Sequence, residues 1–371
     1  MDYDAPDTEW MTIVTETTQE RVETVPPRVW LLLGNRAGDN AQVAALGEAL
    51  GWPVEKKRLN FNALHHNRNL FLGASRRTLD RAQSDKLEPP WPDLVIAAGR
   101  RSAPIARWIR RRSGGKTRLV HIGRPWAPAG WFDLIITTPQ YGMRWRPNVL
   151  VNAAPLHAMT PERLDEAAVL WQPRLAHLPR PWTALLIGGP SDPYRFGPKE
   201  VRGLIDQAVA ATRASGGSLL VTTSGRTPAS VGPALEAWLG DVPHHLFLWR
   251  RDQPDNPYYG YLALADRFIV TGDSVSMMTE TTATGRPVAI YRPAERRRLI
   301  GKRATRVPPL RWLVDVGLLP HPRDIGAFCD RLVASGRAYY LGDPLPERSS
   351  PAPEDMSRAV EHVRGLFKTE G

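Results

Sequence analysis

The chain has 371 residues, of which 42% are hydrophobic and 23% are charged, and it carries a formal net charge of +11. This composition excludes a disordered chain and indicates a globular protein long enough for two domains. No apolar run approaches the roughly 18 residues that a membrane-spanning helix needs. The single cysteine, Cys329, excludes an intrachain disulfide. A basic surface suits nucleic acid, anionic membranes or acidic substrates. Since no nucleic-acid-binding module is visible, nucleic acid is not an expected partner.

The first residues predict a cytoplasmic protein. The segment MDYDAPDTEW is acidic, and it lacks both the apolar core of a signal peptide and the Arg-rich character of an organelle transit peptide. Residues 1–27 are polar, rich in Thr and Glu, and end in two prolines. They predict a disordered head in front of the first domain.

An N-terminal Rossmann-like domain is predicted over residues 28–155. Apolar runs that read as buried strands alternate with polar turns and helical stretches, which is typical of a doubly wound α/β domain. The strands, some with the turn that follows, are Arg28–Leu33, Val54–Leu59, Pro92–Gly99, Leu119–Pro125 and Phe132–Thr137. The loop after the first strand contains Gly34 and Gly38, but the G-x-G-x-x-G spacing of a dinucleotide site is absent.

A second Rossmann-like domain is predicted over residues 182–345, after a linker at 156–181. Residues 346–371 form a tail that ends in a helix of about Pro353–Phe367. The strands of this domain are Trp182–Ile187, Ser218–Thr223, Leu246–Trp249, Phe268–Val270 and Pro287–Tyr291. The predicted fold class is therefore α/β, with two doubly wound domains that face a cleft.

The stretch from Ala265 to Tyr291 holds the main candidate site. Its polar turn follows a strand, where open α/β sheets bind ligands, and a helix is predicted over Val275–Thr284. Either Asp273 or Ser274 can cap this helix, and Gly285 suits its left-handed end. The free N–H groups of the first turn and the positive helix end favour a phosphate.

Three residues at i, i+1 and i+4 of this helix are predicted to share one face: Ser276, Met277 and Glu280. The Glu280 carboxylate can accept hydrogen bonds from two neighbouring sugar hydroxyls. The alternative is that Glu280 is a solvated charge on the helix surface, which is the usual environment of a glutamate.

The segment NPYYGYLALADRFIVTGDSVSMMTETTATGRPVAIY, residues 256–291, resembles the plant elongated-mitochondria fission protein family and its bacterial relatives. It also resembles the nucleotide-binding motif of GT-B glycosyltransferases, in which a helix glutamate holds the ribose of a sugar nucleotide. The resemblance implies a GT-B-like fold whose last helix crosses back to the first domain. It further implies a nucleotide-sugar as substrate, bound in the second domain.

The resemblance also implies roles for particular residues. The loop after the first strand faces the acceptor, so Asp39 is a candidate general base, with Gly38, Asn40 and Gln42 beside the acceptor. Asp39 can equally serve only to cap its own helix. The candidate donor-binding residues are Gly188, Gly189, Ser224, Arg226, Asn256, Tyr258, Asp273, Ser274, Ser276, Met277, Glu280 and Thr281. For Ser224 and Arg226 the alternative is ordinary turn chemistry.

Three further candidates lie at or just after the ends of strands in the first domain. Arg100 and Arg101 come after a strand and before a helix, where paired guanidinium groups suit an anionic acceptor or a diphosphate. His121 is a second candidate catalytic residue, as a base or an orienting group. A lone histidine at a strand end is, however, more often simply hydrogen-bonded structure.

The sequence predicts a site without a metal or a separate cofactor. The one Asp-x-Asp pair, Asp2 and Asp4, lies in the acidic head, and the C-x-x-C and H-E-x-x-H spacings are absent. Helix N-termini and arginines would then stabilise the charge of the leaving group. The first hypothesis is a metal-independent glycosyltransferase that acts on an envelope glycan or a lipid.

Two other functions stay open. The plant fission relatives recruit a dynamin-like GTPase at an organelle surface, so a non-catalytic adaptor is the main alternative. A nucleotide-sugar epimerase is the weaker one. The segment Asn60–Lys86 interleaves Leu64 and Phe71 with arginines, which suggests peripheral contact with an anionic membrane surface, on the inner face of the cytoplasmic membrane.

Overall fold

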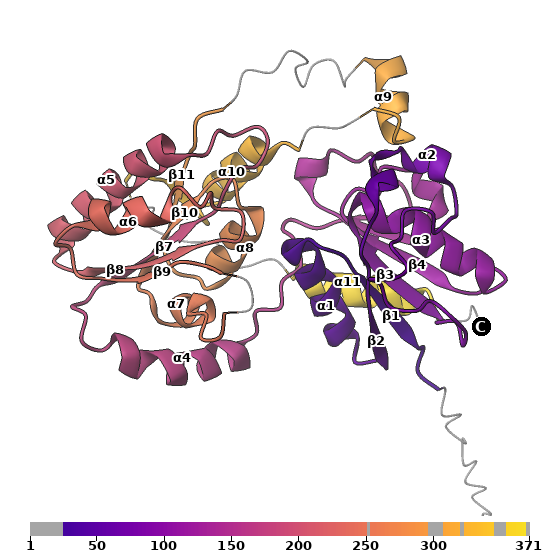
Figure 1. The fold of residues 1–371 in the computed structure, drawn as a ribbon, viewed down its shortest axis with the longest axis horizontal. Coiled ribbons are helices and arrows are strands. Elements are labelled where there is room, and N and C mark those ends of the chain that lie inside the picture. The colour runs from indigo at the N-terminus through magenta and orange to yellow at the C-terminus, as the bar shows by residue number, and fades with distance from the viewer. Residues whose placement is uncertain (1–24, 251–252, 296–306, 320–322, 345–353, 369–371) are drawn as a thin grey trace, which may run out of the picture.

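The computed structural model describes residues 25–250, 253–295, 307–319, 323–344 and 354–368. They form two lobes, each built on a parallel six-stranded sheet (Figure 1). This confirms the predicted α/β fold with two doubly wound domains. The domain boundaries given above stay predictions, and nearly all of the predicted disordered head lies outside the described residues. Within the described ranges, no helix combines the length and the hydrophobicity needed to cross a bilayer.

The first sheet has the strand order β2-β1-β3-β4-β5-β6, and every neighbouring pair is parallel. Its strands are β1 (Val29–Leu33), β2 (Val54–Arg58), β3 (Leu94–Ala98), β4 (Arg118–Ile122), β5 (Leu134–Thr137) and β6 (Val149–Val151). The helices of this lobe are α1 (Ala37–Leu50), α2 (Asn69–Leu72) and α3 (Gly99–Arg112), with single 3-10 turns η1 (Ala63–His66), η2 (Ala129–Trp131) and η3 (Pro139–Tyr141).

The second sheet has the order β12-β11-β10-β7-β8-β9 and is also parallel throughout. Its strands are β7 (Trp182–Ile187), β8 (Ser218–Thr223), β9 (His244–Phe247), β10 (Arg267–Thr271), β11 (Val288–Tyr291) and β12 (Tyr339–Tyr340). The helices of this lobe are α5 (Pro198–Ser215), α6 (Gly232–Leu239), α7 (Tyr258–Leu264), α8 (Val275–Ala283) and α10 (Ile325–Ala334).

Both sheets are apolar on both faces, which explains why their central strands read as continuous apolar runs. Successive side chains of a strand point to opposite faces. In β1, Trp30 and Leu32 therefore join one core cluster while Val29 and Leu31 join another. In β7 the same alternation sends Ala184 and Leu186 to one core and Leu185 and Ile187 to the other.

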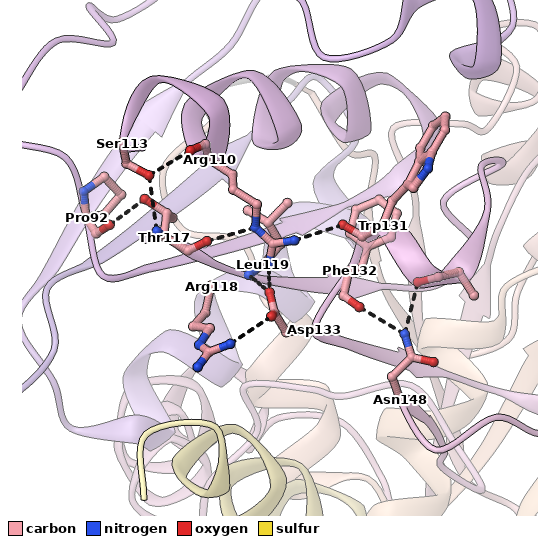
Figure 2. A network of polar contacts seen from close by, with 11 residues as sticks. Pro92, Arg110, Ser113, Thr117, Arg118, Leu119, Trp131, Phe132, Asp133 and Asn148 are labelled. Carbon is pink, nitrogen blue, oxygen red and sulfur yellow. Dashed lines mark hydrogen bonds and ion pairs between the residues drawn. The ribbon is translucent and has the colours of Figure 1, made fainter. Parts of the chain in front are cut away.

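A polar network fixes the outer part of the first sheet (Figure 2). Asp133 lies at its centre, where it pairs with Arg110 of α3 and accepts a hydrogen bond from the backbone N–H of Leu119 at 2.6 Å. Arg110 also donates to the carbonyl oxygens of Thr117 and Trp131. Because these bonds tie the last turn of α3 to the start of β4 and to the turn before β5, they hold the amino ends of these strands together.

Among the described residues, three segments connect the lobes. α4 (Pro161–Leu175) follows the first lobe and packs against α7 of the second. α11 (Asp355–Gly365) returns to the first lobe, where it packs against α1 and buries Ala359 and Val363 (Figure 1). α9 (Pro308–Asp315) comes between β11 and α10 in the sequence, yet Arg311 donates to the carbonyl oxygen of Gly142 in the first lobe at 2.7 Å.

Candidate functional site

Each sheet has one point where the chain order of its strands reverses. This point lies between β1 and β3 in the first sheet and between β7 and β10 in the second. Ligands of open α/β sheets bind outside the carboxyl ends of the strands at such a point, because the flanking loops diverge there. Most of the candidate residues are in the loops that follow β1, β3, β7 and β10, or in the helices α1, α3 and α8 that come next.

The two reversal points face each other across the space between the lobes. The Ser276 hydroxyl, at the start of α8, lies 3.5 Å from the position that a Cβ atom on Gly38 would occupy. Gly38 is in the first turn of α1. The start of a helix from each lobe therefore meets its counterpart there, and we call the space around this contact the cleft.

The loops after β7 and β10 form one packed unit around Asp273. Its buried carboxylate accepts a hydrogen bond from Gly189 N–H at 3.0 Å and pairs with Arg226 at 3.0 Å. A Cβ atom on Gly188 would lie 2.4 Å from this carboxylate, and one on Gly189 would lie 2.2 Å from the Arg226 carbonyl oxygen. Burial raises the pKa of Asp273, and Arg226 acts in the opposite direction. Both glycines are therefore required for close packing.

Asp273 does not cap α8, because its carboxylate turns back to Gly189. Ser274 occupies the N-cap position, and neither it nor any other described side chain makes a capping hydrogen bond there. The helix runs over Val275–Ala283, and Gly285 has the expected positive φ of 72°. The first turn of α8 therefore keeps N–H groups and a positive helix end for an anion.

The predicted shared face of α8 is only partly correct. Ser276 and Glu280 are one turn apart and partly exposed, whereas Met277 is 9% exposed and packs into the core. Each helical residue is rotated by about 100° from the last, and this turns Met277 away from Ser276. Thr281 is fully buried, and its hydroxyl donates to the carbonyl oxygen of Met277 at 2.8 Å. Neither Met277 nor Thr281 reaches the cleft.

Glu280 is not a solvated charge. Its Oε2 accepts a hydrogen bond from the hydroxyl of Tyr258, at the start of α7. Burial raises the pKa of Glu280 to about 7, with the Tyr258 hydrogen bond acting against it. No other hydrogen bond to this carboxylate is found in the described part of the chain, so Oε1 can accept one from a ligand.

Two donor-side candidates make ordinary turn contacts. The hydroxyl of Ser224 accepts a hydrogen bond from Arg226 N–H at 3.3 Å, and the side chain of Asn256 accepts one from Tyr258 N–H at 3.0 Å. These bonds shape the turns that carry Arg226 and Tyr258. The contacts of Ser224 are therefore those of a residue that shapes a turn, which was the alternative to ligand binding. Asn256 makes the same kind of contact.

Asp39 is partly buried between the lobes, among arginines. Burial raises its pKa, and the positive charges of Arg36, Arg323 and Arg101 lower it. Its carboxylate lies close to Gly99, where a Cβ atom would approach Oδ2 to 2.7 Å. No side chain in the described part of the chain caps α1. Asp39 therefore lies in the first turn of its helix without making the capping hydrogen bond that was the alternative to a catalytic role.

The other acceptor-side candidates make hydrogen bonds within the first lobe. Asn40 exchanges two hydrogen bonds with the backbone of Gly34, and Gln42 donates to the Gly38 carbonyl oxygen at 3.2 Å. Arg100 donates to the carbonyl oxygen of His65 at 3.0 Å, and Arg101 donates to the side chain of Asn35 at 2.9 Å. Asn40 and Gln42 thus hold the loop that presents Gly38 and Asp39.

His121 is not brought to the cleft, which corrects the prediction. It lies in β4 with no exposed surface, its ring packs against Phe132, and neither ring nitrogen has a hydrogen-bond partner in the described residues. Burial lowers its pKa to about 3. The side chain points into a covered face of the sheet, so it does not meet a substrate.

Sequence reasoning missed Arg323, a cation whose charge acts on Asp39. Arg323 donates to the Ser191 hydroxyl in the second lobe at 3.1 Å, and its charge acts on both Asp39 and Tyr141. The next residue, Asp324, donates its N–H to the Gln140 carbonyl oxygen of the first lobe at 2.9 Å. No local motif marks Arg323, because its position depends on the chain crossing between the lobes twice.

Comparison with known sequences adds a family and two relatives. The family model described as Mitochondrial fission ELM1 matches residues 37–305. The mitochondrial fission protein ELM1 of Arabidopsis thaliana is 32% identical over 225 residues, which are 55% of this chain and 52% of that protein. The chain thus spans about half the length of that relative. An uncharacterised protein of Rickettsia prowazekii (strain Madrid E) is 24% identical over 71% of this chain and 83% of its own length.

Solved structures share the two-lobed fold. The S. aureus MnaA–UDP co-structure has a TM-score of 0.51 with 11% identity, covering 92% of this chain and 97% of that one. The Methanocaldococcus jannaschii UDP-GlcNAc 2-epimerase, in complex with UDP-GlcNAc and UDP, has a TM-score of 0.50 with 10% identity, covering 91% and 99%. At such low identity these likenesses establish the fold alone.

Proposed function

Because the chain belongs to the mitochondrial fission ELM1 family and has a two-lobed Rossmann-like fold, we propose that its cleft binds a nucleotide-sugar and transfers the sugar to an acceptor. One observation carries this proposal: the reversal points of the two sheets meet at Gly38 and Ser276. A donor held by one lobe would there be adjacent to an acceptor held by the other.

The proposed donor site is on the second lobe. The diphosphate would accept hydrogen bonds from the first turn of α8, with Arg226 as the neighbouring cation. The ribose would donate to Glu280, whose Oε1 is available beside the Tyr258 hydrogen bond. The helix end and the guanidinium would stabilise the charge of the leaving diphosphate, so we propose a reaction without a metal ion.

The proposed acceptor site is on the first lobe. Asp39 would remove the proton of the attacking hydroxyl, and its burial moves its pKa in the direction that a general base at neutral pH requires. Arg36, Arg101 and Arg323 would attract an anionic acceptor, such as a phosphate-bearing lipid or an envelope glycan.

The first lobe carries exposed side chains that suit contact with a membrane surface. Phe71 of α2 is 74% exposed and Leu64 of η1 is 48% exposed, and Arg68 and Arg77 beside them are also exposed. Apolar side chains next to arginines suit the interface of an anionic bilayer. Flotation with phosphatidylglycerol vesicles should recover the protein, and Phe71→Ser should reduce the recovered fraction. Equal flotation with phosphatidylcholine alone would contradict this proposal.

A thermal-shift panel of UDP-, GDP-, CMP- and dTDP-sugars tests the donor site, because a bound ligand raises the melting temperature. The responding donor is then incubated with lipid and glycan acceptors in the presence of EDTA. Sugar transfer supports the proposal. Conversion of the sugar without an acceptor would instead identify an epimerase. Binding without either reaction would instead favour a non-catalytic adaptor.

A further inference from the structure

A second cavity, of about 550 Å³, lies beside the segments that connect the lobes. It is bounded by the segment before α4, by the last turns of α7 and α8, and by the start of α11. Neither Glu280 nor Tyr258 lines it, so it is separate from the proposed donor site. Its volume is in the range of small-molecule sites.

Arg337 brings a buried positive charge to the wall of this cavity. The residue is 9% exposed, and its Nη2 donates to the hydroxyl of Thr282 at 3.2 Å. Its buried Nε has no hydrogen-bond partner, and none of the described carboxylates lies within 4.0 Å of its guanidinium. A buried cation without a counter-ion is costly, and an anion in the cavity would remove much of that cost.

Three acidic residues line the cavity: Asp165 and Glu354 are exposed, whereas Asp355 is buried and already has other partners. Asp355, at the start of α11, accepts hydrogen bonds from the N–H groups of Ala153 at 3.1 Å and Ala154 at 2.8 Å, and it lies 3.6 Å from Arg358. Its charge raises the pKa of Arg337, whereas burial, the larger effect, lowers it. Asp355 thus acts on Arg337 at a distance while it holds the connecting segment.

The rest of the cavity wall is mixed. Leu156, Met159, Leu164 and Leu262 offer apolar surface. The other cation in the wall, Arg286, is occupied by the carbonyl oxygens at the end of α7. Arg337 is therefore the group that would recognise charge, and the leucines and Met159 would cover an apolar body.

We propose that this cavity binds a small amphiphilic anion, with its phosphate or carboxylate group on Arg337 and its apolar part on Leu156, Met159 and Leu164. The occupant would join the segment before α4, the end of α8 and the start of α11. It would supply the counter-ion that Arg337 lacks among the described residues.

Calorimetric titration of the full chain with hexyl phosphate, hexanoate and inorganic phosphate tests this site. Hexyl phosphate should bind at least about tenfold more tightly than inorganic phosphate, because only the former fills the apolar part. Arg337→Met should weaken its binding by about tenfold or more, whereas Arg337→Lys should retain most of it. The matched control is Arg331→Met, which removes an exposed arginine of α10 and should change nothing. Comparison of hexyl phosphate with hexanoate shows which anionic group is preferred.

A second variant keeps the test independent of the stability of Arg337→Met. Ser357 is exposed at the start of α11 and lines the cavity, so Ser357→Trp should obstruct it without disturbing the core. Absence of hexyl phosphate binding, unchanged binding in both Arg337→Met and Ser357→Trp, or loss of binding in Glu280→Gln would overturn the proposal. The last result would place the probe in the cleft. Failure of all nucleotide-sugars to bind would affect only the proposed function.

Discussion

Tyr258 and Glu280 come from different helices and share a hydrogen bond in which the phenol donates to the carboxylate. α7 and α8 are thus joined at the point where the second lobe faces the cleft. The bond also orients the carboxylate, leaving Oε1 for a ligand. Because burial raises the pKa of Glu280 to about 7, its charge changes near neutral pH.

This pKa predicts how stability depends on pH. The folded protein holds the Glu280 proton more tightly than the unfolded chain, whose value is 4.5. The stabilisation is complete below pH 4.5 and is lost as the pH rises through about 7. Between those limits the wild type should lose about 1–3 kcal/mol relative to Glu280→Gln, measured by urea unfolding. A constant difference between the two proteins over this range would contradict the raised pKa.

Gly38 should tolerate only small side chains if the lobes meet where we describe. A Cβ atom there would lie at ordinary contact distance from the Ser276 hydroxyl, so Gly38→Ala should retain nucleotide-sugar affinity. Gly38→Leu should push the lobes apart and lower transferase activity by at least about tenfold. Equal activity of Gly38→Leu and Gly38→Ala would show that the lobes do not approach at this point during turnover.

The loop after β7 should resist substitution for a different reason. In Gly189→Ala the new Cβ atom would lie 2.2 Å from the Arg226 carbonyl oxygen, a backbone atom that cannot rotate away. We expect a loss of about 3 kcal/mol in the free energy of unfolding. Gly130→Ala is the control, since nothing lies within 4 Å of its Cβ position, and it should change stability by less than about 0.5 kcal/mol. A neutral Gly189→Ala would mean that the two loops are not packed as described.

Two arginines that pair with Asp315 should differ sharply in effect. Arg124 is buried, and its Nη2 donates to the Val314 carbonyl oxygen at 3.0 Å and to Asp315 at 3.3 Å, which holds α9 on the first lobe. Arg144 lies 3.9 Å from Asp315 and its side chain is 66% exposed. Arg124→Met should increase amide hydrogen exchange in α9 by at least about tenfold, while Arg144→Met should leave it nearly unchanged. Equal effects would contradict this attachment of α9.

Local pattern was enough to predict five strands of each sheet and the limits of α8 to within one residue, because buried parallel strands read as short apolar runs between turns. The short edge strands β6 and β12 were not predicted. The pattern also indicated Gly188 and Gly189 as residues of a tight loop, and the structure packs them closely against Asp273 and Arg226. It failed where orientation depends on tertiary contacts. The sequence does not show whether the side chain of His121, in β4, points into the core or toward the cleft. The rotation of Met277 into the core likewise depends on which side of α8 the second sheet covers.

Chain crossings account for the other omissions. α9 was not predicted, and the basic stretch before it falls mostly on residues 296–306, outside the described residues. Arg323 follows α9 and reaches Ser191 of the second lobe while its charge acts on Asp39 of the first. To predict such a position, one must know the path of the chain between the lobes, and hydrophobic periodicity does not give that path.

The central claim is that Glu280 binds the ribose of a nucleotide-sugar, and one comparison tests it most directly. The responding nucleotide and its 2′,3′-dideoxy analogue are titrated into the wild type and into Glu280→Ala by calorimetry. The wild type should prefer the ribonucleotide by at least about tenfold, because only that ligand donates hydroxyl protons to the carboxylate, and Glu280→Ala should lose the preference. An undiminished preference in Glu280→Ala would contradict the assignment of Glu280 as the ribose-binding residue.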